Sequence, residues 1–410
     1  MKILISAVGD TDPIRNFHDG PLLHIVRVYR PEKIVLVHSE RSLTKHDKLV
    51  KALKSIKDYS PEIIQDGGVL PDEQVAIFDK MYDTVSSIVK KYISDDEIIL
   101  NISSATPQII SAMFAVNRIS DFNVTAVQVV TPQHKSNEGL RHDNQEDIDT
   151  LIETNLDNQS DYENRTLEDT GMKFSQDLTK RNLKALIDNY DYQGALELLK
   201  KQKSFSNIKE LRKKLTEISD TIKIQGMPDK IVKAKLSTKA QSALNSYLNI
   251  DRNHKQGNIA EVLIRVKSLV EFILENYLNN HFLDVITYKE DGKPFLNASK
   301  YPEILKKFQE DAKMRGQEYH SGYLSLPAYI GILKFFEPNH DLLKHIYKIQ
   351  EINQVRNQVA HSLQAFDRKN LKKVSSAVFA SKQILLASFD IDNHWFSFYE
   401  DLNQEIKKLL

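Results

Sequence analysis

Along the first 130 residues, short runs rich in β-branched residues alternate with longer segments whose apolar positions repeat with helical spacing. The strand-like runs lie at 3–8, 33–37, 62–64, 97–102 and 123–130, and the helical segments lie at 21–29, 43–57, 73–91 and 107–119. Runs that are apolar throughout and joined by helix-length connections indicate parallel strands covered on both faces. The pattern therefore predicts a doubly wound α/β domain with a Rossmann-like fold.

The pattern changes in the second half of the chain, where strand signals almost vanish. Residues 143–169 carry many acids and predict a solvated connector with one helix near Ile148 to Glu153. Helical periodicity then occurs at 178–200, 208–224, 234–248, 259–278, 301–312, 327–336, 341–361, 371–386 and 397–409. We predict an α/β domain over residues 1–170, a helical connector over 171–255 and an all-α domain over 256–410.

The composition removes several classes of protein. The chain has 56 Lys and Arg residues and 56 Asp and Glu residues, so any contact with nucleic acid must use a local basic patch. It has no cysteine, which excludes disulfides, thiol nucleophiles and thiolate zinc sites. The first apolar run ends at Gly9 and is too short for a signal peptide or a membrane span. We expect a cytoplasmic protein without membrane association.

Residues that directly follow the predicted strands are candidate ligand contacts, because ligands of open parallel sheets bind outside the carboxyl ends of the strands. The candidates, which share hydroxyl, amide or charged side chains, are Asp10, Thr11, Asp12, Ser39, Ser103, Ser104, Thr106, Gln108, Thr131 and Lys135. Thr106 followed by Pro107 predicts a helix start whose N–H groups could meet a phosphate. Because the dinucleotide-binding and P-loop glycine motifs are absent, neither a dehydrogenase nor an ATP-driven motor is favoured.

The spacing Arg-x4-His occurs three times, and we predict that one copy is catalytic. The copy at 41–46 follows the second predicted strand and is expected on a solvated face or the ligand rim. The copy at 315–320 contains Gly316 and predicts a loop. Only the copy at 356–361 falls on a predicted amphipathic helix, with its arginine and histidine opposite the apolar stripe. That stripe is formed by Ile352, Val355, Val359, Leu363 and Phe366.

Arg356, Asn357 and His361 are candidate catalytic residues for cutting RNA without a metal. The RNA 2′-hydroxyl would attack the neighbouring phosphorus, histidine would move a proton, and arginine would stabilise charge on the phosphoryl oxygens. Asn357 lies one turn before His361 and could orient its ring. Arg356 and His361 are about 140° apart on the helix, so a composite site from two copies would bring them together.

These residues resemble a known combination of domains. The N-terminal half resembles a CARF domain, through its Gly9-Asp10-Thr11-Asp12-Pro13 turn and its loop from Ser103 to Gln108. The C-terminal half resembles a HEPN ribonuclease domain, whose Arg-x4-6-His motif matches residues 356–361. The domain order is similar to that of the ancillary ribonucleases of type III-A CRISPR systems from streptococci and enterococci. Ala105 departs from the family pattern, where a glycine is frequent.

The resemblance implies a homodimer activated by a cyclic oligoadenylate, expected to be cyclic hexa-adenylate, that cleaves single-stranded RNA in antiviral defence. It implies that Asp12, Thr106 and Gln108 line the activator pocket, and that this pocket also cleaves its activator in some relatives. No metal or other cofactor is expected. The alternative from the residues alone is a non-enzymatic nucleotide sensor whose helical half recruits a partner or nucleic acid.

Overall fold

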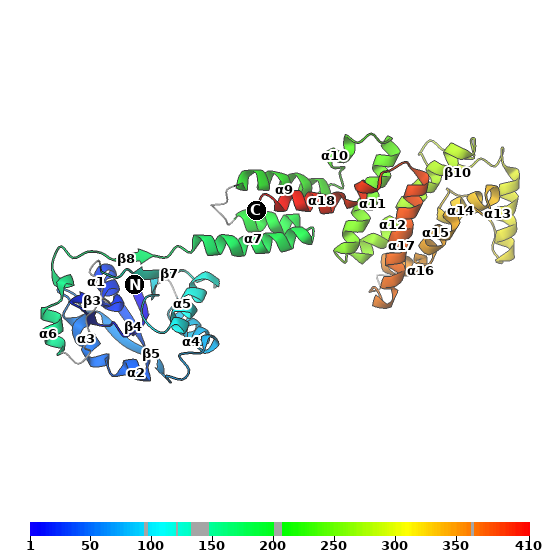
Figure 1. The fold of residues 1–410 in the computed structure, drawn as a ribbon. Helices are drawn as coiled ribbons and strands as arrows, with labels where there is room; N and C mark the ends of the chain where they lie inside the picture. The colour runs from blue at the N-terminus through cyan, green and yellow to red at the C-terminus, as the bar shows by residue number, and fades with distance from the viewer. Residues whose placement is uncertain (94–96, 120–121, 133–146, 201–206, 362–364) are drawn as a thin grey trace. The chain divides into compact units, whose positions relative to one another are not determined.

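The computed structural model describes residues 1–93, 97–119, 122–132, 147–200, 207–361 and 365–410 (Figure 1). The chain divides into two compact units, Met1–Asp177 and Leu178–Leu410. The first unit is α/β and the second is helical, as the sequence predicted. No helix among the described residues is long and apolar enough to cross a membrane.

Six strands form the sheet of the first unit, in the order β5-β4-β1-β6-β7-β8. They are β1 (Lys2–Ala7), β4 (Lys33–Ser39), β5 (Glu62–Leu70), β6 (Glu97–Asn101), β7 (Val124–Val129) and β8 (Thr166–Glu168). All neighbours are parallel except β7 and β8. The chain therefore moves outward from β1 in one direction through β4 and β5, and in the other through β6 and β7. This reversal creates a topological switch point between β1 and β6.

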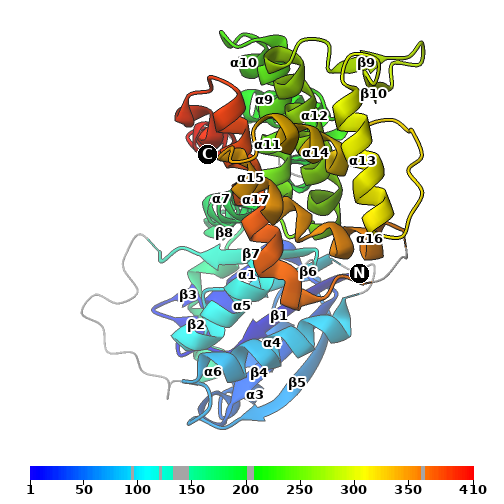
Figure 2. The ribbon, with the colours of Figure 1, turned by 90° about the vertical axis from the view of Figure 1, so that its right-hand side faces the viewer.

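Helices cover both faces of this sheet and separate its core into two layers. The helices are α1 (Pro21–Tyr29), α2 (Glu40–Leu43), α3 (His46–Lys54), α4 (Phe78–Tyr92), α5 (Pro107–Ile119) and α6 (Ile148–Glu153). One core layer joins the sheet to α4 and α5, which lie side by side in Figure 2, and the other joins it to α1, α3 and α6. Alternate residues of β1 enter opposite layers, Ile3 and Ile5 on one side and Leu4 on the other. The doubly wound prediction is confirmed.

The acid-rich segment before the second unit differs from the predicted solvated connector. Asp157 is only 3% exposed and Arg165 only 6% exposed, and Thr166–Glu168 add an antiparallel edge strand to the sheet. Sequence composition suggested solvation because Asp157 and Arg165 each carry a charge. Their mutual ion pair, 2.8 Å between Arg165 NH2 and Asp157 Oδ2, makes their burial tolerable.

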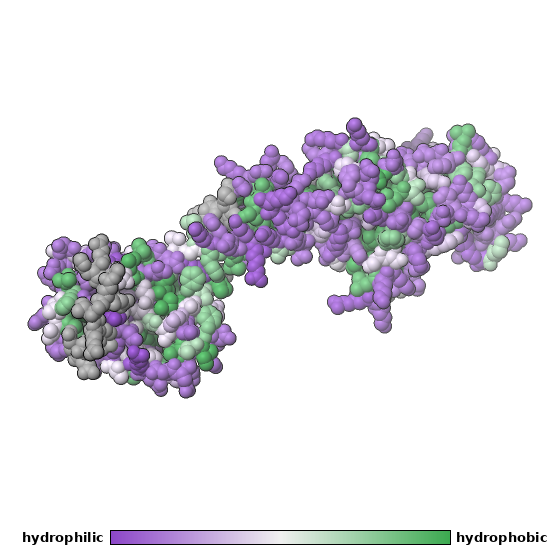
Figure 3. Space-filling model, in the orientation of Figure 1, coloured by the Kyte–Doolittle hydropathy of each residue, from purple (hydrophilic) through white to green (hydrophobic). Residues whose placement is uncertain are grey.

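The second unit consists mainly of helices around one large core. They are α7 (Met172–Asp188), which starts in the first unit, α8 (Tyr192–Lys200), α9 (Ile208–Lys223), α10 (Asp229–Val232), α11 (Thr238–Lys255), α12 (Ile259–His281), α13 (Pro302–Met314), α14 (Leu326–Phe336), α15 (Leu342–Gln350), α16 (Asn353–His361), α17 (Leu371–Ser388) and α18 (Phe398–Lys407). A short hairpin, β9 (Ile286–Tyr288) and β10 (Pro294–Leu296), was not predicted. The view in Figure 3 shows a largely hydrophilic surface on this unit, as a solvated helical bundle requires.

Two predicted long helices are each divided in the structure. The segment at 178–200 breaks at Tyr190, whose φ of 57° lies outside the helical region. The segment at 341–361 breaks after Gln350, where Ile352 N donates to Ile349 O instead of continuing the regular ladder. Ile352 and Val355 are nevertheless buried, so the predicted apolar stripe faces the core. Leu363 of that stripe lies outside the described residues.

Candidate functional site

The loops after β1 and β6 meet at the switch point of the sheet. A Cβ atom added to Gly9 would lie 3.1 Å from Ala105 N and 3.2 Å from Ser104 Cβ, so the two loops are in direct contact. Gly20 is equally confined, since a Cβ there would lie 2.5 Å from Thr11 O. The small residues thus allow three backbone segments to converge where a doubly wound fold binds its ligand.

Asp12 builds this loop from inside. It is 2% exposed, and its carboxylate accepts hydrogen bonds from Gly9 N at 2.9 Å and Leu22 N at 3.0 Å. Burial raises the pKa of Asp12, although these bonds, Ser104 and Lys45 act in the opposite direction. Asp12 was expected to line the ligand pocket, but its burial and backbone partners give it a supporting role in the loop.

A chain of hydrogen bonds fixes Ser103 between β6 and β7. Asn101 Nδ2 donates to Ser6 Oγ at 2.9 Å, and Asn101 Oδ1 accepts from Ser103 N at 2.9 Å. Ser103 Oγ in turn accepts from Val129 N at 2.7 Å. The start of the loop after β6 is therefore tied to both neighbouring strands, β1 and β7.

The other predicted ligand residues around these loops differ in solvent exposure and in their hydrogen bonds. Ser104 is buried, whereas Gln108 is partly exposed. Thr106 Oγ1 donates to Val75 O at 3.0 Å and accepts from Ile109 N at 3.4 Å, so this residue caps α5 as predicted. Ser39 caps α2 by accepting from Ser42 N at 3.2 Å. Both hydroxyls thus also hold local structure.

Asp10 is exposed at the same edge of the sheet and lies within a small charged group. Its carboxylate is 3.1 Å from Arg41 NH2 and 3.7 Å from Lys45 Nζ. Lys45 Nζ also donates to the carbonyl oxygens of Gly9 and Asp10, at 3.2 and 3.0 Å. Lys45, which the sequence analysis did not select, therefore stabilises the β1 loop. Lys135, a predicted contact, lies outside the described residues.

A cavity of about 190 Å³ opens beside these loops. Three predicted ligand residues, Thr11, Ser103 and Thr131, contribute to its wall. The remaining lining residues are Arg15, His18, Asp19, Gly20, Pro21, Val129, Val130, Pro132 and Arg165. The structure thus brings predicted residues from the ends of β1, β6 and β7 together with residues that the sequence analysis did not select. These are Arg15, His18 and Asp19 of a short hairpin, and Arg165.

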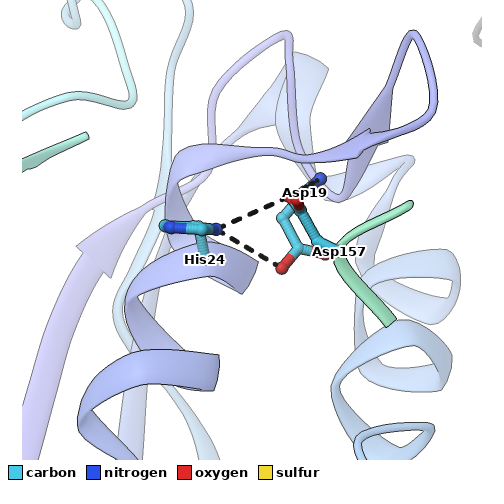
Figure 4. Close-up of side chains that lie close together, drawn as sticks. All are labelled: Asp19, His24 and Asp157. Carbon is cyan, nitrogen blue, oxygen red and sulfur yellow. Dashed lines mark hydrogen bonds and ion pairs between the residues drawn. The ribbon is translucent and has the colours of Figure 1, made fainter. Parts of the chain in front are cut away.

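Behind the cavity, a buried ionic network joins residues far apart in the sequence. Asp19, His24 and Asp157 face one another, with His24 Nδ1 3.6 Å from each carboxylate (Figure 4). Arg165 N donates to His24 Nε2 at 3.0 Å, and Arg165 NH2 lies 3.2 Å from His24 Nδ1, so both ring nitrogens contact the same arginine. Each acid also has a guanidinium partner, since Arg27 binds Asp19 through two hydrogen bonds.

The ligand atoms of Asp19, His24 and Asp157 are close enough for a metal ion, since they lie within 4.8 Å of one another. The adjacent guanidinium groups of Arg27 and Arg165 already balance the two carboxylates, and they would repel a cation. We therefore interpret the cluster as an ionic network that anchors residues 155–165 to β3 (His18–Asp19) and α1.

The candidate catalytic residues lie on α16. Arg356 is half-buried and Asn357 is exposed, and Arg356 NH1 donates to Asn357 Oδ1 at 3.0 Å. His361 ends the helix, and its side chain lies outside the described atoms. Helical geometry separates Arg356 and His361 by about 140° in angle and about 7.5 Å along the axis. The two positions therefore lie on different sides of α16.

The other two copies of the spacing lie in different settings. Arg41 is on α2 and is paired with Asp10, while His46 starts α3. Arg315 follows α13, where its Nε donates to Asp311 O at 3.0 Å, and His320 lies in an irregular segment. In neither copy do the arginine and the histidine lie on the same helix. For the copy at 315–320, this agrees with the predicted loop.

Comparison with known proteins finds the same architecture in a family of ribonucleases. Residues 62–166 match the Cas_Csm6 CARF domain, residues 172–218 match the 6H domain of CRISPR-associated protein Csm6, and residues 231–407 match the Cas_Csm6 HEPN domain. A "CRISPR system endoribonuclease Csm6′" of Streptococcus thermophilus is 40% identical over 98% of both chains. The chain belongs to the Csm6 family of CRISPR endoribonucleases.

The likeness to this family extends over the whole chain. Csm6 of Enterococcus italicus is 33% identical over 100% of both sequences. A solved structure described as "Enterococcus italicus Csm6 bound to cyclic hexa-2′-fluoro-hexa-dAMP" covers 100% of both chains with a TM-score of 0.72. The predicted combination of a CARF domain and a HEPN domain is confirmed. The predicted boundaries at residues 170 and 255 stay predictions.

The sequence analysis did not select Arg15, His18 and Arg165, which line the cavity. Arg15 and His18 lie on a two-stranded hairpin, β2 (Ile14–Arg15) and β3, whose strands are too short to give an alternating pattern. Arg165 lies more than 140 residues from the loop it contacts. The one available signal was that Arg165 is a lone cation among acids, which favours an ion pair.

Proposed function

We propose that this Csm6-family chain is a cyclic oligoadenylate-activated endoribonuclease that cleaves single-stranded RNA in type III CRISPR defence. The observation that carries the proposal is the likeness, along the whole of both chains, to a Csm6 solved with a cyclic hexanucleotide. In this chain the activator, cyclic hexa-adenylate, would bind at the carboxyl ends of β1, β4, β6 and β7. The contact residues proposed there are Asp10, Thr11, Ser39, Ser103, Ser104, Thr106, Gln108, Thr131 and Lys135, with Asp12 supporting the loop.

The proposed active site is composite and forms from two copies of α16 in a homodimer. The angle between Arg356 and His361 on one helix supports this, because one copy cannot direct both groups to a single phosphate. Arg356 would bind the phosphoryl oxygens, and Asn357, which accepts a hydrogen bond from Arg356, would hold its guanidinium in place.

The proposed reaction needs only protein groups. The RNA 2′-oxygen forms a bond to phosphorus as its proton leaves, and the bond from phosphorus to the 5′-oxygen breaks as that oxygen gains a proton. His361 would transfer or position one of these protons. The products are a 2′,3′-cyclic phosphate and a 5′-hydroxyl, and DNA, which has no 2′-hydroxyl, would be inert.

A fluorescent-RNA assay in excess chelator, with and without cyclic hexa-adenylate, tests the proposal. We expect cleavage only with the activator, and its loss in Arg356→Ala and His361→Ala. The matched control is the double variant Arg315→Ala and His320→Ala, which carries the same motif spacing and should retain cleavage. Activator binding without cleavage in the unmodified protein would instead support a non-enzymatic sensor.

The same preparation addresses whether the activator pocket also degrades its ligand. Cyclic hexa-adenylate would be incubated with the Arg356→Ala variant, whose RNA site is disabled, and analysed for linear products. Ring opening by this variant would assign the second activity to the N-terminal unit. An intact ring would limit this chain to RNA cleavage.

A further inference from the structure

The cavity beside the β1 loop is lined by Arg15, a cation that forms no ion pair with an acid among the described residues. Arg15 is half-buried, its Nε atom is buried, and within the described residues its side chain makes no hydrogen bond or ion pair. A buried guanidinium donor without an acceptor is costly, so an arginine in this state favours an anionic partner.

The neighbouring charges are already satisfied within the protein. Asp19, the acid that lines the cavity, accepts hydrogen bonds from Arg27 Nε at 2.6 Å, from Arg27 NH2 at 3.0 Å and from Asn155 Nδ2 at 2.6 Å. Asp157 is paired with Arg165 at 2.8 Å and with His18 at 3.2 Å. The positive charge of Arg15 is therefore available to a ligand.

The hairpin that carries Arg15 holds it in a fixed position. Arg15 is paired with His18 across the two strands, so both side chains point to the same face and both line the cavity. The two turn residues, Asn16 and Phe17, have φ values of 47° and 62°, which suits a tight two-residue turn. Phe17 O accepts from Leu156 N at 2.8 Å, which ties the turn to the buried ionic network.

A second guanidinium faces the same space. Arg165 is buried, with 5% of its side chain exposed, and its terminal nitrogens bind Asp157, Asp19 O and Val130 O. Its Nε atom has no hydrogen-bond partner among the described residues. Thr11 and Ser103, two hydroxyl residues, complete this side of the wall. Two guanidinium groups and two hydroxyls form a set that recognises a phosphate.

We propose that this cavity is a phosphate subsite of the activator pocket, in which Arg15 binds one phosphodiester of the cyclic oligoadenylate. The proposal rests on the proposed function and extends it to a residue outside the strand-end loops. Arg165 would contribute its Nε and hold the wall of the subsite, and the hairpin would keep Arg15 in place before the ligand arrives.

The test measures the affinity of the full-length protein for cyclic hexa-adenylate by calorimetry at several salt concentrations. Arg15→Ala should raise Kd by about tenfold or more, because a charge-assisted hydrogen bond is lost. Arg15→Lys, which keeps the charge without the planar fork, should fall between Arg15→Ala and the unmodified protein. The control is Arg30→Ala at the C-terminal end of α1, where Arg30 NH1 donates to the carbonyl oxygens of Lys57 and Asp58 and the guanidinium lies over the Tyr59 ring, away from the cavity lining. Its Kd should stay within about twofold of the unmodified value.

Salt dependence separates a phosphate contact from a contact to a base. Loss of one phosphate contact should reduce the slope of log Kd against log salt concentration by about 0.7. A Kd and slope for Arg15→Ala equal to those of the unmodified protein would overturn the subsite, with a thermal melt of Arg15→Ala and Arg15→Lys to verify folding. If the unmodified protein itself does not bind cyclic hexa-adenylate, the proposed function fails as well, so the two failures are distinguishable.

Discussion

The imidazole rings of His38 and His46 meet nitrogen to nitrogen, with His38 Nε2 3.0 Å from His46 Nδ1. His38 lies at the end of β4 and is fully buried, and its other ring nitrogen is 3.3 Å from Ser42 Oγ. Two imidazolium ions could not occupy this arrangement, because both facing nitrogens would carry protons. We therefore expect the stability of the first unit to depend on pH in the acidic range.

Burial, reinforced by the charge that His46 carries when protonated, lowers the pKa of His38 to about 4. The unfolded chain takes up this proton near pH 6.5, so the free energy of unfolding should fall as pH decreases from about 6.5 to about 4. His38→Gln should flatten the curve in that range, measured by urea unfolding at a series of pH values. The control is His394→Gln, at a histidine with 65% of its side chain exposed, and an unchanged slope for His38→Gln would contradict the prediction.

Asp157 and Arg165 form an ion pair that is nearly inaccessible to solvent. Burial acts to raise the pKa of Asp157, but hydrogen bonds from His24, Asp19 N and His18 outweigh it and hold this pKa well below its usual range. Asp157→Asn should lower the free energy of unfolding by about 3 kcal/mol, because it leaves a buried guanidinium without its counter-charge. Asp149→Asn breaks the exposed pair with Lys51 and should cost less than about 1 kcal/mol in the same urea titration. Equal costs for the two variants would be evidence against this ranking.

Ala105 has a φ of 133°, a backbone region that residues with a side chain rarely adopt. Ala105→Gly should therefore raise the free energy of unfolding by about 1 kcal/mol, since relief of strain exceeds the added freedom of the unfolded chain. Ala112→Gly, within helix α5, is the opposite control and should lower stability by about the same amount. Loss of stability in both variants would show that Ala105 is not strained.

Asn357 is the exposed partner of Arg356 on α16. Asn357→Ala should reduce kcat for RNA cleavage by about tenfold with little change in KM, because it removes the hydrogen bond that holds Arg356, the proposed phosphate-binding residue. Gln354→Ala, an exposed residue on the same helix, is the matched control and should leave both constants unchanged. A rise in KM at constant kcat would instead place Asn357 in substrate binding.

Much of the N-terminal fold could be predicted from local patterns. The predicted bounds of α1, α5 and α6 equal those observed, because Pro21 and Pro107 mark helix starts and Asp147 caps α6 through its side chain. The alternation of apolar runs with helical segments was also sufficient for the doubly wound topology. The apolar stripe was sufficient to predict the position of α16, but the sequence pattern did not show the break after Gln350, where Ile352 N donates to Ile349 O.

The sequence by itself determined the order of elements, the two kinds of domain and the motif at 356–361, because these depend on contacts between residues close together in the chain. Only the tertiary structure decided which charged residues are buried and paired within the protein and which could still bind a ligand. The pairing of Asp157 with His18, Asp19 and His24 spans more than 130 residues, and among the described residues it leaves Arg15 Nε, beside the cavity, without a partner. Charge compensation of this kind depends on distance in space and on exclusion of water, neither of which local sequence encodes.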